Sequence, residues 1–193
     1  MKNKEKVVEV LALMDRSGSM SNIITEAVGS FNEFINQQKE INDNNVVLVT
    51  LAAFDDKYEV VFDKVLLEKL PELTVDMVKP RGMTALNDAI GKLINSSENS
   101  DRPTVLLIQT DGMENASQEY NSSDIKKLIE QKEEAGWDVN FIGAGMDSFE
   151  VERMALERGF KLDKTITVSK DASGMDSLRA FYATTVSDYR SEV

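Results

Sequence analysis

Short, nearly uninterrupted apolar segments alternate along the chain with longer segments in which apolar residues recur every three or four positions. This alternation restricts the fold more than any other feature. A strand that is apolar at consecutive positions is typical of a parallel sheet covered on both faces, and parallel strands are usually connected by a helix. The predicted strands are residues 7–14, 46–54, 104–109, 138–142 and, more weakly, 164–168.

The segments between these strands have the spacing of amphipathic helices. Ser21 precedes the first of them and Ser122 or Ser123 the third, and serine is a common helix N-cap. Gly136 and Gly159 stand where the third and fourth helices should end, because glycine readily adopts the left-handed conformation that ends many helices. The predicted helices are residues 23–35, 85–94, a segment around 125–129, about 148–158 and about 175–189.

One segment departs from the strand–helix alternation. Residues 55–57 form a polar turn, and apolar residues then alternate with mostly charged ones from Tyr58 to Asp63. Too few residues intervene for a crossover helix, so we expect an antiparallel hairpin at the edge of the sheet. Glu59 and Asp63 would protect that edge from pairing with another chain. The sequence thus predicts a doubly wound α/β fold, mostly parallel with one antiparallel edge strand. Without a repeat or linker, residues 1–193 are expected to form one domain.

Composition excludes several classes of function. Lys and Arg number 22 and Asp and Glu 34, for a net charge of −12, so nucleic acid and anionic membranes are poor partners. No apolar run approaches the roughly 20 residues of a membrane-spanning helix. With neither His nor Cys, the chain cannot hold a Ser-His-Asp triad, a catalytic thiol or a usual zinc site. The lack of disulfides and of a recognisable signal peptide predicts a cytoplasmic location.

Candidate functional residues follow the predicted strands. In a doubly wound sheet, ligands bind outside the carboxyl ends of the strands, near the point where strand order reverses. The motif Asp-x-Ser-x-Ser follows the first strand, Thr-Asp-Gly follows residues 104–109, and Arg-Gly-Met-Thr precedes the second helix. All three loops should open at the same end of the sheet. The oxygen-bearing residues that they contribute are Asp15, Ser17, Ser19, Thr84 and Asp111.

These five side chains would make a site of oxygen ligands only, which suits a hard cation such as Mg²⁺. Gly18 allows the chain to bend tightly between the two serines. Each motif alone has an ordinary alternative, because Asp and Ser after a strand commonly cap a helix or form a turn. The three loops together favour the metal site.

The same motifs resemble those of the von Willebrand factor type A (vWA) domain and its metal-ion-dependent adhesion site. The matching segments are residues 15–20, 82–86 and 110–112, and the separations of 69 residues from Asp15 to Thr84 and 96 residues from Asp15 to Asp111 are typical of the family. The absence of a secretion signal makes the chain more similar to intracellular bacterial or phage-type members than to the extracellular adhesive ones.

This resemblance implies a function as well as a fold. The hydroxyls of Ser17, Ser19 and Thr84 would coordinate Mg²⁺ or Mn²⁺, and Asp15 and Asp111 would act directly or through bound water. A carboxylate from a partner protein would fill the remaining coordination position. The resemblance thus implies a divalent-cation-dependent protein-binding module, not an enzyme, whose oligomeric state the sequence does not indicate.

Two alternatives remain at this point. The chain could be a Mg²⁺-dependent phosphotransfer or hydrolase enzyme with Asp15 as its nucleophile. Such chemistry generally needs a second acidic residue two positions later, where this chain has Ser17. The chain could also be a structural scaffold with a vestigial metal site, because a fold does not determine a function.

Two further groups of residues lie in the same loops. Met20, Met83, Met113 and Met146 could form an adaptable apolar rim around the site, or they could be buried gap-filling residues. Arg16 and Arg81 could guide an acidic ligand to the site. Alternatively, they could be exposed to solvent or paired with Asp55, Asp56 or Glu114.

Overall fold

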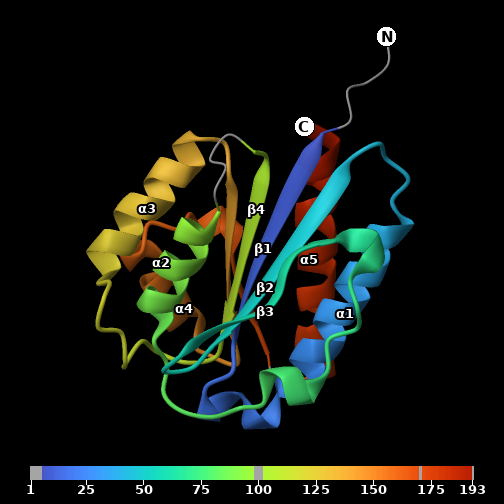
Figure 1. Cartoon of the computed structure of the whole chain (residues 1–193). Coiled ribbons are helices and arrows are strands. Elements are labelled where there is room, and N and C mark those ends of the chain that lie inside the picture. The colour runs from blue at the N-terminus through green and yellow to red at the C-terminus, as the bar shows by residue number, and fades with distance from the viewer. Residues whose placement is uncertain (1–5, 98–101, 170, 193) are drawn as a thin grey trace.

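The computed structural model describes residues 6–97, 102–169 and 171–192, which form a central sheet between two layers of helices (Figure 1). The sheet has six strands in the order β3-β2-β1-β4-β5-β6, and all neighbours are parallel except β2 and β3. This is the predicted doubly wound α/β fold. The strands are β1 (Val7–Asp15), β2 (Val46–Phe54), β3 (Tyr58–Leu66), β4 (Thr104–Thr110), β5 (Asp138–Ala144) and β6 (Thr165–Val168).

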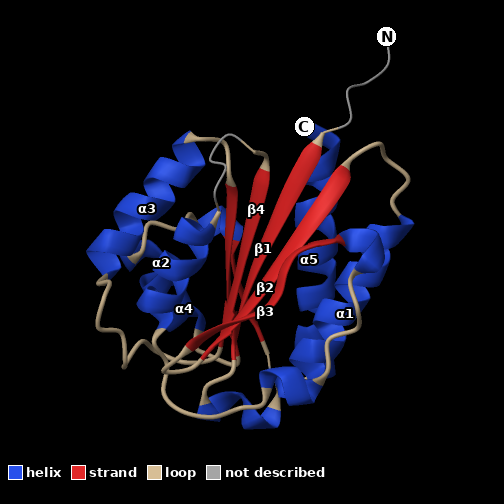
Figure 2. Ribbon diagram, in the orientation of Figure 1, coloured by secondary structure: helices blue, strands red, loops and turns tan. Residues whose placement is uncertain are grey.

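The helices cover both faces of the sheet (Figure 2). Helices α1 and α5 lie on one face, and α2, α3 and α4 on the other (Figure 1). None of the described helices is long and apolar enough to cross a membrane. The helices are α1 (Ile24–Glu40), α2 (Leu86–Ser96), α3 (Ser122–Glu134), α4 (Ser148–Glu157) and α5 (Ala172–Glu192).

The central strand β1 shows why the apolar segments are nearly uninterrupted. Val10 and Ala12 pack with residues of α1 and α5, whereas Leu11 and Leu13 pack with residues of α2, α3 and α4. Successive side chains of a strand point to opposite faces of the sheet, and both faces are buried here. An apolar residue is therefore needed at almost every position of the strand.

The helix boundaries confirm the predicted C-terminal signals and correct the N-terminal ones. Gly136 and Gly159 follow α3 and α4 with positive φ angles of 88° and 83°. Ser21 does not cap α1, because its hydroxyl donates to the carbonyl of Gly18 within a short 3₁₀ helix, Gly18–Asn22.

The start of α3 also differs from the prediction. Asn121 is the N-cap, in place of Ser122 or Ser123. Its side chain accepts a hydrogen bond from the Asp124 backbone N–H, and the Asp124 carboxylate accepts one from the Asn121 N–H. Asn and Ser are both common N-cap residues, so residue type alone does not show which of three neighbouring positions caps the helix. The N-cap is the residue whose side chain reaches the free backbone N–H groups, and here that residue is Asn121.

The sheet topology defines one end for the predicted site. The chain passes from β1 to β2 on one side and later returns through β4 on the other side of β1. Strand order therefore reverses at β1. Because β1 and β4 are parallel, the loops that follow them leave the sheet at the same end, which is the lower end in Figure 1. This is where ligands bind in open α/β sheets.

Candidate metal site

Asp15 is the last residue of β1, and its side chain is fully buried. One carboxylate oxygen accepts a hydrogen bond from the Ser17 backbone N–H at 2.6 Å, and the other accepts one from the Thr110 hydroxyl at 2.6 Å. Burial raises the pKa of Asp15 to about 6, although the hydrogen bonds from Thr110 and Ser17 oppose the increase and nearby Asp111 adds to it. Asp15 is therefore a fixed carboxylate whose charge is costly in the absence of a cation.

The two serines and Asp111 form a continuous chain of oxygen atoms. The Oγ atoms of Ser17 and Ser19 are 3.0 Å apart, and the Ser19 hydroxyl donates to Oδ1 of Asp111 at 2.6 Å. Neighbouring ligands of an octahedral Mg²⁺ at 2.0–2.1 Å from the ion are roughly 3 Å apart. The spacing of these oxygen atoms therefore fits two or three adjacent positions of such a coordination sphere.

Gly112 shows that Thr84 belongs to the same site. A Cβ atom built on Gly112 would lie 3.3 Å from Oγ1 of Thr84, 3.5 Å from Oγ of Ser19 and 3.9 Å from Oγ of Ser17. Three hydroxyl oxygens from two separate loops thus surround one point. The structure brings together all five side chains predicted from the sequence.

Backbone hydrogen bonds hold the loops in register. Gly18 donates to the carbonyl of Gly82 at 3.2 Å, and Arg81 donates to the carbonyl of Arg16 at 2.8 Å. Gly82 has a positive φ of 68°, and a Cβ atom there would collide with the carboxylate of Asp56. Only glycine fits this position without strain.

Thr110 and Asn115 support the site, although sequence reasoning assigned no role to either. Thr110 holds Asp15 through its hydroxyl. The side chain of Asn115 accepts the Thr84 N–H at 2.9 Å, while the Asn115 N–H donates to the Thr84 carbonyl at 3.0 Å. Thr110 is part of the Thr-Asp-Gly motif and Asn115 lies four residues after Asp111, and these positions are the signal that could have identified them.

The donor chemistry fits a hard divalent cation. No group of three or more carboxylates that could hold a metal occurs among the described residues, so any metal here would depend on hydroxyl ligands. Gly112 presents no side chain towards the three hydroxyls, and a Cβ atom there would already lie within 3.3 Å of Oγ1 of Thr84. Neutral hydroxyls with two carboxylates would leave a dication able to attract a further anion.

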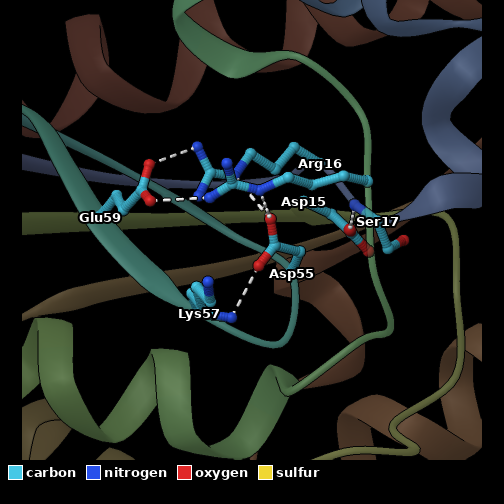
Figure 3. Close-up of polar contacts among 7 residues, drawn as sticks. Asp15, Arg16, Ser17, Asp55, Lys57 and Glu59 are labelled. Atoms are coloured by element: carbon cyan, nitrogen blue, oxygen red, sulfur yellow. Dashed lines mark hydrogen bonds and ion pairs between the residues drawn. The ribbon is translucent and has the colours of Figure 1, made fainter.

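A cluster of four charged side chains lies beside the metal loops (Figure 3). Nε of Arg16 and Nε of Arg81 contact the same Asp55 oxygen at 3.0 and 2.7 Å, and each guanidinium also contacts Glu59 at 2.7 Å. Arg16 is only 3% exposed, whereas Arg81 and Glu59 are each 49% exposed. Pairing with Asp55 confirms one of the sequence-based alternatives for these arginines. The pairing with Glu59 was not predicted.

We expect Glu59 to make a pH-dependent contribution to stability. Hydrogen bonds from Arg16 and Arg81 lower its pKa from 4.5 to about 2. A lowered pKa in the folded state stabilises the protein above the unfolded value, and this stabilisation is lost as pH falls from about 4.5 towards 2. At pH 6 the wild type should therefore melt at a higher temperature than Glu59→Gln, and the difference should shrink steadily as the pH falls from about 4.5 to 3.

Glu133→Gln provides a matched control for this comparison, because Glu133 pairs with Lys161 away from the metal loops. Melting curves of the three proteins between pH 3 and pH 6 test the prediction. A constant difference between wild type and Glu59→Gln across this range would contradict it.

The four methionines do not behave as one group. Met20 is completely buried in the core beneath α1, and Met146 is partly buried. Met83 and Met113 are 57% and 50% exposed, and they adjoin Thr84 and Gly112 in the site loops. The gap-filling interpretation is thus confirmed for Met20 and wrong for Met83 and Met113, while an apolar rim could include only the exposed pair.

Comparisons with known proteins agree with the architecture. The family model of the von Willebrand factor type A domain matches residues 9–180. A structure of proximal thread matrix protein 1 from the mussel byssus, with a zinc-occupied MIDAS motif, has a TM-score of 0.70 and 15% identity. The match covers 94% of this chain but 48% of the mussel chain, so this chain spans less than half of that protein.

Two bacterial structures are also similar in fold. The vWF domain of the type V pili tip protein Mfa5 from Porphyromonas gingivalis has a TM-score of 0.68 and 10% identity, over 98% of this chain and 97% of the other. BatB from Bacteroides thetaiotaomicron has a TM-score of 0.58 and 16% identity, over 93% and 99% of the two chains. No curated protein sequence gives a significant match. Because the family model covers most of the sequence, the chain belongs to the von Willebrand factor type A domain family.

Proposed function

We propose that this chain is a divalent-cation-dependent protein-binding module. In this proposal Ser17, Ser19 and Thr84 coordinate Mg²⁺ or Mn²⁺ through their hydroxyls, and Asp15 and Asp111 act directly or through water. A carboxylate of a partner protein completes the coordination sphere. The observation that carries the proposal is the convergence of the three hydroxyl oxygens within 3.9 Å of one point beside Gly112.

The residues of the chain would have distinct roles in such a site. Both oxygens of Asp15 already accept hydrogen bonds, from Ser17 and Thr110, so this carboxylate is suited to orienting the loop and balancing charge. The Ser19 hydroxyl donates its hydrogen to Asp111, and the lone pairs of Oγ of Ser19 can therefore point towards other partners. A bound cation would supply an electrophilic position for an external carboxylate.

The comparisons support the general form of this proposal. Domains of this family often mediate metal-dependent protein interactions, and the zinc-occupied motif of the mussel protein makes divalent-cation binding plausible here. The choice of Mg²⁺ or Mn²⁺, the carboxylate partner, an intracellular bacterial or phage-type origin, a cytoplasmic location and a single domain over residues 1–193 remain parts of the proposal.

The enzymatic alternative has less support. A nucleophilic carboxylate must approach its substrate, whereas Asp15 is fully buried and engaged by two donors. Ser17 stands where a second acid would be needed, and the chain contains no histidine. Hydrolysis of a phosphate ester in Mg²⁺ that is lost in Asp15→Asn would nevertheless favour an enzyme.

Thermal unfolding in chelator and in excess MnCl₂ tests the metal site. A ligand that binds only the folded state stabilises it by about 2.7 kcal/mol at 100 times its dissociation constant, which should raise the melting temperature by roughly 5–10 °C for a domain of this size. Ser19→Ala should remove this rise. Ser191→Ala, whose hydroxyl only bonds the backbone near the end of α5, should retain it. Identical wild-type melting curves in both conditions would favour a vestigial scaffold.

The partner requires a separate experiment. Proteins captured by the wild type from a lysate of its source in Mg²⁺, but neither in chelator nor by Ser17→Ala, would be the expected partners. Substitution of individual acidic residues in such a protein should abolish its capture. Capture that is equal with and without metal would contradict a shared coordination sphere.

A further inference from the structure

The charged cluster of Arg16, Asp55, Glu59 and Arg81 joins three parts of the chain that meet beside the metal loops. Figure 3 shows Arg16, Asp55 and Glu59 next to Asp15 and Ser17. Arg16 directly follows Asp15, Asp55 lies in the turn between β2 and β3, and Glu59 lies on β3. Arg81 begins the segment that leads to Thr84, and no secondary structure fixes this segment. The cluster thus ties an irregular loop to the end of the sheet.

The contacts at Arg81 place it at the start of a short connection to Thr84. Its backbone N–H donates to the Arg16 carbonyl, and its guanidinium bridges Asp55 at 2.7 Å and Glu59 at 2.7 Å. On the other side of Thr84, the Ala85 N–H donates to the carbonyl of Asp55 at 2.9 Å. Asp55 therefore anchors the loop at both ends, through its carboxylate and through its backbone.

The charges in the cluster balance. Two guanidinium groups face two carboxylates, and Lys57 bonds to Asp55 through its backbone N–H and its carbonyl. Without the carboxylates, the buried charge of Arg16 would stand next to a site for a dication and would oppose binding. A geometric role and an electrostatic role of the cluster can therefore be separated. If a positive charge is removed, the geometric role predicts weaker metal binding, whereas the electrostatic role predicts equal or tighter metal binding.

We propose that Arg81, paired with Asp55 and Glu59, is a positioning residue that holds the Thr84 hydroxyl at the metal site. This inference rests on the proposed function and adds a determinant of metal affinity that touches no metal. Planar guanidinium groups that form two hydrogen bonds fix geometry in a way that an ammonium group does not. Arg81→Gln and Arg81→Lys should thus both weaken metal binding.

Isothermal titration calorimetry with MnCl₂ at fixed ionic strength tests the inference. Residues that orient metal ligands typically change affinity by 10–100-fold when replaced, and we expect Arg81→Gln and Arg81→Lys each to raise the dissociation constant for Mn²⁺ about tenfold. Lys161→Gln is the matched control, since it removes one positive charge from a 60% exposed lysine that pairs with Glu133 away from the metal loops, and it should not alter affinity. Melting in chelator checks that each variant is folded, which the 49% exposure of Arg81 favours.

The outcomes separate position from charge. If Arg81 acted only through the electrostatic effect of its positive charge, Arg81→Gln would bind Mn²⁺ as tightly as wild type or more tightly. Arg81→Lys, which keeps the charge, would have the same affinity as wild type. Either result overturns the inference while leaving the proposed function intact. A wild-type chain that does not bind Mn²⁺ would overturn the proposed function, and the inference with it.

Discussion

Replacement of Gly112 by alanine is expected to abolish metal binding without removing a single ligand. The new methyl carbon would lie 3.3 to 3.9 Å from the hydroxyl oxygens of Thr84, Ser19 and Ser17, which is ordinary or slightly tight van der Waals contact. It would therefore lie against all three oxygens and compete for the space of a cation that needs these ligands at 2.0–2.1 Å. The backbone of Gly112 does not have a positive φ, so its conformation is one that alanine can adopt, and only the Thr84 hydroxyl would have to shift slightly.

The expected result for Gly112→Ala is a folded protein whose melting temperature is the same in chelator and in excess MnCl₂, with at least a 100-fold loss of Mn²⁺ affinity by calorimetry. Gly29→Ala is a matched control. Gly29 lies in α1 with no atom within 4 Å of the added carbon, so the change should stabilise the helix by about 0.5–1 kcal/mol. It should leave the metal response unchanged. A Gly112→Ala protein that retains the Mn²⁺ response would place the cation elsewhere.

The architecture could be predicted from the sequence because each strand must bury both of its faces. Leu11 and Ala12, adjacent in β1, enter different cores, and this requirement makes the strand recognisable as a continuous apolar run. The turn at residues 55–57 could be recognised because it is too short for a crossover helix. The convergence of the loops then follows from the topology, since parallel strands present the same end.

The details of the site could not be predicted in the same way, because they depend on side-chain geometry between distant segments. From the sequence, Glu59 is expected to protect the edge of the sheet with its charge. In the structure, it forms ion pairs with both Arg16 and Arg81. Thr110 and Ser21 are both small hydroxyl residues in plausible positions. The first holds Asp15, whereas the second only bonds Gly18. The residue type determines which hydrogen bonds and ion pairs a side chain can form. Only the folded structure determines which partners are within reach.

Asp15→Asn should make the protein more stable in chelator while removing its response to metal. Asp15 is fully buried, and no described residue forms an ion pair with it. Its pKa is raised from 3.8 to about 6 because burial disfavours the charged form. At pH 7.5, above both values, the charge destabilises the folded state by up to about 3 kcal/mol, at 1.36 kcal/mol for each pKa unit.

An asparagine can keep the local hydrogen bonds. Its carbonyl oxygen can accept from the Ser17 N–H, as Asp15 does now. Its NH₂ group can donate to Thr110, whose hydroxyl can turn to donate to the Gly112 carbonyl at 3.1 Å. We therefore expect a net gain of about 1–2 kcal/mol in chelator, or roughly 2–8 °C in melting temperature.

Asp43→Asn is the matched contrast to Asp15→Asn. Burial acts to raise the pKa of Asp43, but hydrogen bonds from Arg190 and Asn45 outweigh it and lower the pKa. Loss of that carboxylate breaks a pair with the buried Arg190 at 2.9 Å and should lower the melting temperature. Opposite shifts for the two Asp-to-Asn changes in chelator, with the metal response lost only in Asp15→Asn, would mean that Asp15 is kept charged for its ligand at the expense of the fold. A lower melting temperature for Asp15→Asn in chelator would instead make this carboxylate a structural residue.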